Sequence, residues 1–177
     1  MFFPGARVKV ISLEGRDTPT LPMFNRVRQF AALDASQKLI FVQVWFLLGW
    51  IRVAILTVSF KRLTASLQHH REIVPPISVE LEEREQAARI GILVASAAKY
   101  TPWQSLCLAQ VLTVQRLLSR RNIPGQFYLG VCKNGEEGAD PTGLAAHAWL
   151  QCGDVIVNGG AGHQEYTVVS TFSWGRL

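Results

Sequence analysis

The stretch WQSLC at residues 103–107 begins the helix around which the rest of this 177-residue chain is arranged. Thr101-Pro102 ends whatever precedes it, because proline disfavours the α conformation in the residue before it. Ser105 is the predicted N-cap, which places Cys107 at the second helical position. An apolar face follows at helical spacing, with Cys107, Val111, Val114 and Leu118. A thiol in the first turn lies near backbone N–H groups without helical acceptors, and these stabilise the nucleophilic thiolate.

The stretch AHAWL at residues 146–150 supplies a candidate base for that thiol. It lies in a predicted strand from Ala145 to Cys152, and Gly153-Asp154, which follows this strand, is a turn signal. Three further strands are predicted, over residues 126–132, 155–158 and 166–172, with a polar loop at 133–143. A Cys–His nucleophile pair needs this order, because a rigid strand then fixes the base. A free cysteine alone is more often structural, so the prediction of catalysis depends on the two residues together.

Further motifs follow in the same order along the chain. They are PWQSLCL at 102–108, RLL at 116–118, NIP at 122–124, LGV at 129–131 and AHAWL at 146–150. In this order the chain resembles the lasso-peptide leader peptidases, which belong to the transglutaminase-like superfamily of papain-related folds. The resemblance runs from about Phe24 to Tyr166. It implies an α+β fold: a papain/transglutaminase-like core, with a Cys-bearing helix packed on an antiparallel sheet, and a helical N-terminal part.

The resemblance also implies a function, that of a bacterial cysteine peptidase. It would remove the leader from a ribosomally made lasso-peptide precursor, so that an ATP-dependent partner cyclase can close the ring. The expected partners are the precursor, this cyclase and a small leader-binding recognition protein, since the sequence shows no leader-reading module. There is no phosphate loop of the G-x-x-x-x-G-K type, so ATP would enter through the cyclase.

Two alternatives remain open on the sequence. One is a transglutaminase-like amide transferase, in which an amine rather than water attacks the thioester. The other is a non-catalytic scaffold or membrane-associated assembly protein, in which Gly159 marks a decayed site.

The group that would orient the imidazole departs from the family pattern. The family usually has an aspartate twelve residues after the histidine, and here that position is Gly159. Asp154 has suitable chemistry but lies seven residues from His147, about 20 Å along an extended strand. A two-residue turn at 153–154 would pair 149 with 158, which puts Asn158 on the His147 face. Asn158 is therefore the predicted third catalytic residue, as in Cys-His-Asn sites. Asp154 or no third group is the alternative, and a bulge would turn Asn158 away.

Three residues around the pair are candidates for substrate binding. Trp103 either lines the substrate groove or anchors the helix start in the core. Gln104 is a candidate oxyanion donor, although its spacing from Cys107 is not papain-like and the Cys107 N–H is the better donor. Trp149 shares a strand face with His147 and is expected to pack against the imidazole. His163 is expected at the surface of a Gly-rich loop, and Cys132 and Cys152 are assigned no chemistry.

Three parts are expected along the chain: an N-terminal extension at 1–22, a helical partner-docking part at 23–76, and the peptidase core at 77–177. Asp34 is predicted to cap a long helix that runs towards Leu67. After a Pro-containing linker, Ser78 is predicted to cap a second helix that packs beside the Cys107 helix.

The segment from Leu39 to Phe60 is apolar and long enough to span a bilayer. Gln43 and Arg52 interrupt it, and a central arginine costs roughly 2.5–3.5 kcal/mol in a membrane. We therefore expect burial in the domain or docking on a partner, with weak membrane contact as the alternative.

Composition narrows the remaining classes. With 49% hydrophobic residues the chain has enough apolar material for one domain with a real core. Three cysteines without paired spacing argue against a disulfide framework and against zinc, and they favour a reducing cytoplasm. The net charge of +5 comes without an interleaved aromatic and basic run, so nucleic acid is not expected. No metal or cofactor is expected.

Overall fold

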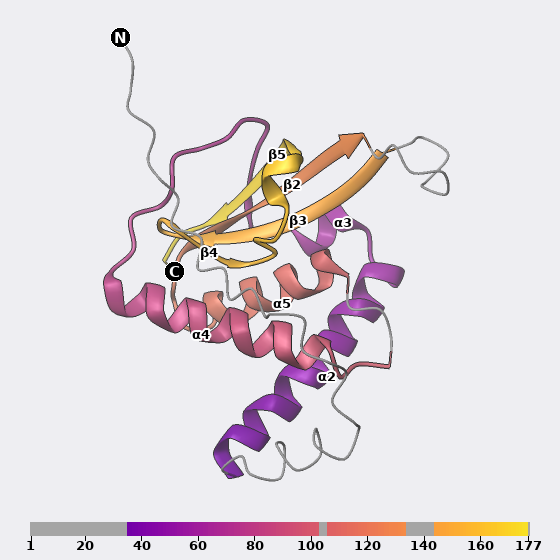
Figure 1. Ribbon diagram of the computed structural model, residues 1–177, viewed down its shortest axis with the longest axis vertical. Helices are drawn as coiled ribbons and strands as arrows, with labels where there is room; N and C mark the ends of the chain where they lie inside the picture. The colour runs from indigo at the N-terminus through magenta and orange to yellow at the C-terminus, as the bar shows by residue number, and fades with distance from the viewer. Residues whose placement is uncertain (1–34, 103–105, 134–143, 177) are drawn as a thin grey trace.

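The computed structural model describes residues 35–102, 106–133 and 144–176 of the chain. Among them a five-stranded antiparallel sheet is covered on one face by helices (Figure 1). The elements are α2 (Ala35–Thr57), α3 (Phe60–Leu63), β1 (Gln68–His70), α4 (Leu81–Ala98), α5 (Cys107–Ser119), β2 (Gly125–Lys133), β3 (Leu144–Cys152), β4 (Val155–Asn158), the 3₁₀ turn η1 (His163–Glu165) and β5 (Thr167–Trp174). The predicted α+β class is confirmed. The expected extension at 1–22 and the Asp34 cap lie outside the described residues.

The sheet has the strand order β1-β5-β2-β3-β4, and every pairing is antiparallel. The four strands predicted from the alternation of apolar and polar residues, β2 to β5, are confirmed to within two residues at each end. The register of β2 on β3 is regular and places Gly130 opposite His147. Because cross-strand partners share a face, Tyr128 and Trp149 lie on the same face as His147.

The opposite face of the sheet carries the core. Phe127 and Leu150 on the central strands are fully buried there, against Val94 of α4 and Leu118 of α5. The close approach of α4 to β4 requires a glycine. A Cβ on Gly91 would lie 1.8 Å from the carbonyl oxygen of Val157, so a side chain at this position would push the helix off the sheet.

The N-terminal helix is shorter than predicted. α2 ends at Thr57 instead of running towards Leu67, and the chain then forms the short helix α3 and the edge strand β1. Thr57 donates its hydroxyl to the Val53 carbonyl, and such bonds favour an end to the helix. The β-branched Val58, which follows Thr57, also has a low helix propensity. Residues 68–70 pair with β5, so tertiary contact decides their conformation. Local sequence pattern did not reveal this strand.

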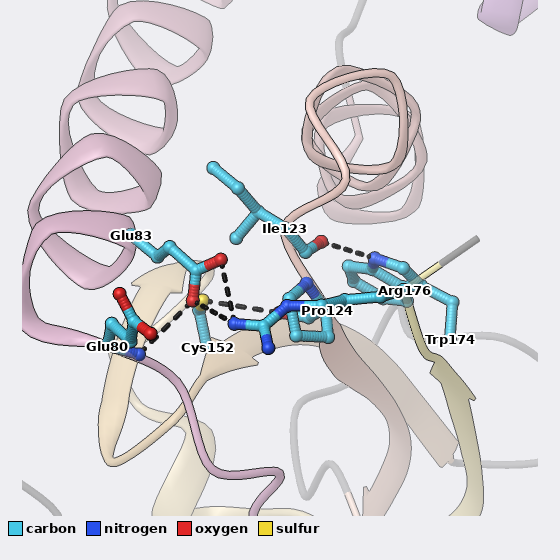
Figure 2. Close-up of polar contacts among 7 residues, drawn as sticks. All are labelled: Glu80, Glu83, Ile123, Pro124, Cys152, Trp174 and Arg176. Atoms are coloured by element: carbon cyan, nitrogen blue, oxygen red, sulfur yellow. Dashed lines mark hydrogen bonds and ion pairs between the residues drawn. The ribbon is translucent and has the colours of Figure 1, made fainter.

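Two helix starts also differ from the prediction. α4 begins at Leu81 with Glu80 as N-cap, not at Ser78, and the Glu80 N–H donates to the Glu83 carboxylate at 3.1 Å (Figure 2). This is a capping box built on a glutamate, which keeps negative charge at the positive end of the helix dipole. α5 begins at Cys107 with Leu106 as N-cap, so Cys107 is the first helical residue and not the second.

α2 packs into the same core as the other helices, since Val44 and Leu48 are buried in the main cluster. Among the described residues, the segment Leu39–Thr57 is long and apolar enough to cross a membrane, by length and composition only. Most of that segment is not buried inside the domain. Of the two expectations for this segment, burial in the domain is wrong for its outward side, and docking on a partner stays a prediction.

Candidate active site

The first turn of α5 places the Cys107 thiol against the middle of β3. Leu106 has an extended backbone, with φ −56° and ψ 155°, and the helix begins at Cys107. The thiol is half-buried and lies within hydrogen-bonding distance of the backbone N–H groups of Leu108 and Ala148. One donor thus comes from the helix start and one from the strand that carries His147. The structure brings together the two residues that the sequence predicted as a pair.

The orientation of His147 follows from two hydrogen bonds. Its Nε2 atom lies 2.8 Å from the carbonyl oxygen of Gly159. A carbonyl oxygen can only accept, so Nε2 carries a proton in every state of the ring. The second bond joins the imidazole to the thiol of Cys107, and only Nδ1 remains to make it. Nδ1 is therefore the nitrogen that exchanges a proton with sulfur.

The two groups shift each other's pKa in opposite directions. Partial burial raises the pKa of Cys107. The hydrogen bond and charge of His147, with the N–H groups of Ala148 and Leu108, outweigh it and leave the pKa below its ordinary value. The hydrogen bond to Cys107 raises the pKa of His147; burial works against this, and the Gly159 carbonyl adds to it. Both shifts favour a thiolate–imidazolium pair, which is the reactive form of a cysteine nucleophile.

The predicted role of Asn158 rests on a strand alignment that is wrong. Cys152 pairs with Val155 as expected, but the register shifts between Leu150 and Gln151, so Asn158 pairs with Leu150 instead of Trp149. The shift is a bulge, which turns Asn158 to the helix-covered face of the sheet, away from His147. Its Nδ2 donates to Oε1 of Gln110 in α5 at 3.4 Å. Asn158 thus connects β4 to the helix of Cys107.

The other predicted candidate, Asp154, is held at the far end of the hairpin. Its carboxylate accepts from Nη1 of Arg84 in α4 at 2.5 Å. The sequence argument that distance excludes Asp154 agrees with this position. The acceptor at the imidazole is instead the main chain of the residue at the family's aspartate position.

Gly159 is suited to that position by having no side chain. Its φ is +72°, and a Cβ there would lie 2.4 Å from the carbonyl oxygen of Ala148 and 3.0 Å from Cα of Trp149. Any other residue would be strained in this conformation and would also collide with β3. Because Gly159 has no side chain, its backbone can lie close to β3, and its carbonyl oxygen then reaches the imidazole of His147.

Aromatic rings surround the imidazole on the outer face of the sheet. Trp149 is stacked on His147 at 5.9 Å between ring centroids, and Tyr166 lies tilted at 5.0 Å. The predicted contact of Trp149 with the imidazole is confirmed. Trp149 is itself 5% exposed, so its larger contribution is to packing around the ring. Its role in substrate binding stays a prediction.

Sequence reasoning missed two residues of this cluster. His163 was expected at the surface; it is half-buried in η1, 5.7 Å from Trp149 between ring centroids, and its Nδ1–H donates to the Gly160 carbonyl at 2.5 Å. Tyr166 contacts the His147 ring and hydrogen-bonds Cys132 of β2, and desolvation together with the contact to Cys132 raises the pKa of its phenol. Both residues come from a loop whose path no spacing rule fixes.

Trp103 and Gln104, the other predicted substrate-binding residues, lie outside the described residues. Within the described part of the chain, no group of three or more His, Cys, Asp or Glu side chains could hold a metal ion.

The remaining thiols differ from Cys107. Cys152 is fully buried, and its Sγ donates to the Pro124 carbonyl at 3.4 Å (Figure 2). Burial and the nearby Glu83 carboxylate raise its pKa to about 12, against the opposing effect of Arg84. Cys132 lies on the His147 face, two residues along β2 from Gly130, and is half-buried.

The family of this chain follows from a match to a family model. The model of the transglutaminase-like superfamily matches residues 54–171, which is about two thirds of the chain. The chain belongs to the transglutaminase-like superfamily. The match includes Cys107 and His147, and it covers both the helix and the sheet that hold them. Searches of curated proteins and of solved structures gave no match.

Proposed function

We propose that this chain is a cysteine peptidase that removes the leader from a ribosomally made lasso-peptide precursor before a partner cyclase closes the ring. One observation carries the catalytic part. The Nε2–H of His147 donates to the Gly159 carbonyl, which leaves Nδ1 to accept the proton of Cys107. The substrate class rests on the order of the PWQSLCL, NIP, LGV and AHAWL motifs, with which the chain resembles leader peptidases.

In the proposed mechanism the thiolate of Cys107 attacks the carbonyl carbon of the scissile peptide bond. The oxyanion that forms accepts hydrogen bonds from backbone N–H groups at the start of α5, which have no helical acceptor. Nδ1–H of His147 then gives its proton to the leaving amine, and the C–N bond breaks. His147 next takes a proton from water, the hydroxide attacks the thioester, and the acid product leaves as the Cys107 thiolate is restored.

The Gly159 carbonyl acts as the orienting group in this scheme. It fixes the tautomer of His147, which is one task of the carboxylate or amide in a triad. A neutral carbonyl stabilises the imidazolium less than a carboxylate does, because it has no net charge to offer. We therefore expect a Cys–His pair assisted by the main chain, with a lower intrinsic rate than a site with aspartate.

Partners supply the rest of the proposal. A leader-binding recognition protein presents the precursor, an ATP-dependent cyclase takes the product, and all of them work in the cytoplasm. Amide transfer is the second candidate, because the superfamily fold and a thioester intermediate serve both reactions. In that case an amine, not water, would attack the thioester of Cys107.

The test combines the purified chain with a precursor peptide, its leader-binding protein and the cyclase. Mass spectrometry should show free leader with one water added, and Cys107→Ala should reduce its formation at least a thousandfold. Cys152→Ser, a change to a thiol distant from the pair, should leave cleavage within about threefold.

The same reaction separates the alternatives. With excess hydroxylamine or a primary amine present, a product that carries the amine in preference to water would favour the transferase. If the Cys107→Ala variant supports lasso formation as well as the unaltered chain, the scaffold interpretation is right and the peptidase proposal is wrong.

A further inference from the structure

The helix α2 has two apolar faces, of which only one is covered. Val44 and Leu48 are buried in the core, and Phe41, Ile51 and Ile55 pack beside them. The outward face carries large apolar side chains that the domain leaves exposed: Leu39, Ile40, Val42, Phe46, Trp50, Val53 and Leu56. Trp50 is 72% exposed and Phe46 is 65% exposed. Figure 1 shows α2 along one side of the molecule, away from the sheet.

The outward face continues into a groove between α2, α4 and α5. The groove has a volume of about 630 Å³ and is lined by apolar side chains of all three helices, among them Phe46, Trp50 and Leu117. Arg120 and Arg121, at the exposed end of α5, line the same groove. None of the described residues that line it is acidic. Apolar surface and positive charge therefore lie side by side.

The sequence around the groove carries charge of one sign. Residues 35–71 contain no aspartate or glutamate, and they include Arg52, Lys61, Arg62 and Arg71. The acidic residues of the described α-helices are in α4, in the first turn at Glu82 and Glu83 and next to it at Glu85. The partner of the outward face must therefore be apolar over a wide area and negatively charged at its edge.

We propose that α2 and this groove bind an anionic lipid bilayer, with α2 lying in the plane of the membrane surface. At 100° per residue the exposed apolar positions cover roughly 200° of the helix surface, which is wider than the stripe used to dock a partner helix. Acyl chains would contact Phe46 and Trp50, and lipid phosphates would meet Arg120 and Arg121. Tryptophan is enriched at this depth of a bilayer, and arginine pairs with phosphate.

One observation favours a helix that lies in the membrane plane over one that crosses the bilayer, and a second favours a membrane over a second copy of the chain. Val44 and Leu48 attach α2 to the core, so the helix cannot cross the bilayer without leaving its own domain. A second copy of the chain is a poorer occupant, because pairing two such faces would bring positive charges together without acidic partners. The inference does not depend on the proposed peptidase activity, and binding should be the same in a Cys107→Ala variant.

The experiment is cosedimentation of the full chain with large vesicles of two compositions. Vesicles of phosphatidylglycerol and phosphatidylcholine in equal parts should bind the chain, and pure phosphatidylcholine should bind it at least twenty-fivefold less. Arg120→Gln with Arg121→Gln should weaken binding to the anionic vesicles roughly twenty-fivefold, since each arginine near such a surface contributes about fivefold. This double variant should also reduce the dependence of binding on salt concentration.

A second variant tests the apolar contact. Phe46→Gln with Trp50→Gln should lower binding at least tenfold and leave the melting temperature unchanged, because both side chains are exposed. The matched control is Val169→Gln, which alters an exposed apolar residue of β5 on the other side of the molecule and should bind like the unaltered chain.

Several results would overturn the proposal. Equal binding to both kinds of vesicle would mean that the arginines do not bind lipid phosphates. No binding to either kind would mean that this face does not bind a membrane. If sedimentation velocity without lipid shows a dimer that Phe46→Gln with Trp50→Gln dissociates, a second copy occupies the face. If only an acidic amphipathic peptide binds and vesicles do not, the occupant is a partner protein.

Discussion

The thiol of Cys107 lies against the middle of β3 and that of Cys152 lies at its C-terminal end, and the two surroundings affect reactivity in opposite ways. Cys107 has a histidine and two backbone N–H groups around its sulfur, and it is half-buried. Cys152 is fully buried beside the Pro124 carbonyl, with the Glu83 carboxylate nearby (Figure 2). The first environment offers donors and positive charge, and the second offers a carbonyl acceptor and the charge of Glu83, which Arg84 only partly opposes.

The contrast teaches that burial alone does not decide the state of a thiol. Burial raises the pKa of both sulfurs, but donors overcome it at Cys107 and nothing comparable does so at Cys152. With a pKa of about 12, roughly one Cys152 thiol in 10⁵ is ionised at pH 7. The helix start and His147 therefore determine where the nucleophile is.

The largest expected effect is in alkylation of the two thiols. Limiting iodoacetamide near neutral pH should label Cys107 first, with a rate at least a hundredfold above that of Cys152. Thiolate is the reactive form, and Cys152 has almost none. Peptide mapping by mass spectrometry measures each site, and labelling of Cys152 or Cys132 ahead of Cys107 would contradict the comparison.

The pH dependence of this labelling gives the sign of the pKa shift. The pKa of Cys107 is lowered, so its rate should rise with pH at lower values than the rate of a free cysteine, whose pKa is about 8.5. In His147→Ala the burial remains and the main donor is lost. The rise should then move to higher pH, and labelling near neutral pH should fall at least tenfold.

The sequence predicted the pair because a short-range rule applies at each residue. A helix after Pro102 and an alternating strand through residues 146–150 place Cys107 and His147 with little dependence on the rest of the chain. The positions of β2 to β5 along the chain and the confirmed α+β class follow from the same kind of pattern, whereas the order of the strands in the sheet depends on tertiary packing. The roles of both residues in catalysis stay predictions until the labelling and cleavage experiments are done.

The group that orients the imidazole of His147 could not be predicted from the sequence, for a physical reason. A bulge of one residue between Leu150 and Gln151 reverses the face of Asn158, and no residue type in VIVN announces it. A backbone carbonyl as orienting group leaves no side-chain signature, so Gly159 was interpreted only as a departure. Tyr166 reaches the imidazole, and His163 reaches Trp149, through a loop geometry that tertiary packing sets. The edge strand β1 was missed likewise, because only β5 makes it a strand.

A smaller effect is expected from Gly159→Ala, which changes the environment of Cys107 and leaves that of Cys152 alone. The new Cβ would lie 2.4 Å from the Ala148 carbonyl oxygen, so the main chain must shift away from β3 and lengthen the 2.8 Å bond to His147. Loss of this bond lowers the pKa of His147 and raises that of Cys107. Leader cleavage should fall about tenfold in kcat with KM unchanged, and the alkylation profile should move to higher pH.

Gly162→Ala is the matched control for this change. Gly162 also has a positive φ, +69°, but a Cβ there meets nothing within 4 Å. Both variants pay the strain of a left-handed alanine, about 1 kcal/mol of folding stability. Only Gly159→Ala should alter the pH profile of Cys107, and equal kinetic losses in the two variants would mean that backbone strain, not the hydrogen bond, is responsible.

A still smaller effect is expected from Asn158→Ala, and it tests the alignment of β4 directly. In the structure Asn158 touches Gln110 in α5 and does not face His147, so its loss removes one bond between β4 and the Cys107 helix. The alkylation rate of Cys107 should change by less than about fivefold, because a neutral hydrogen bond of this kind contributes about 1 kcal/mol. Its pH profile should not move, since the Gly159 carbonyl still fixes the tautomer of His147.

Asp154→Ala, which removes a partly exposed ion pair with Arg84, should leave both measurements unchanged. A tenfold loss with a shifted profile in Asn158→Ala alone would mean that the amide, and not the Gly159 carbonyl, holds the imidazole in solution. The bulge would then be absent from the working enzyme, and the two thiols would differ through a side-chain triad instead of the main chain.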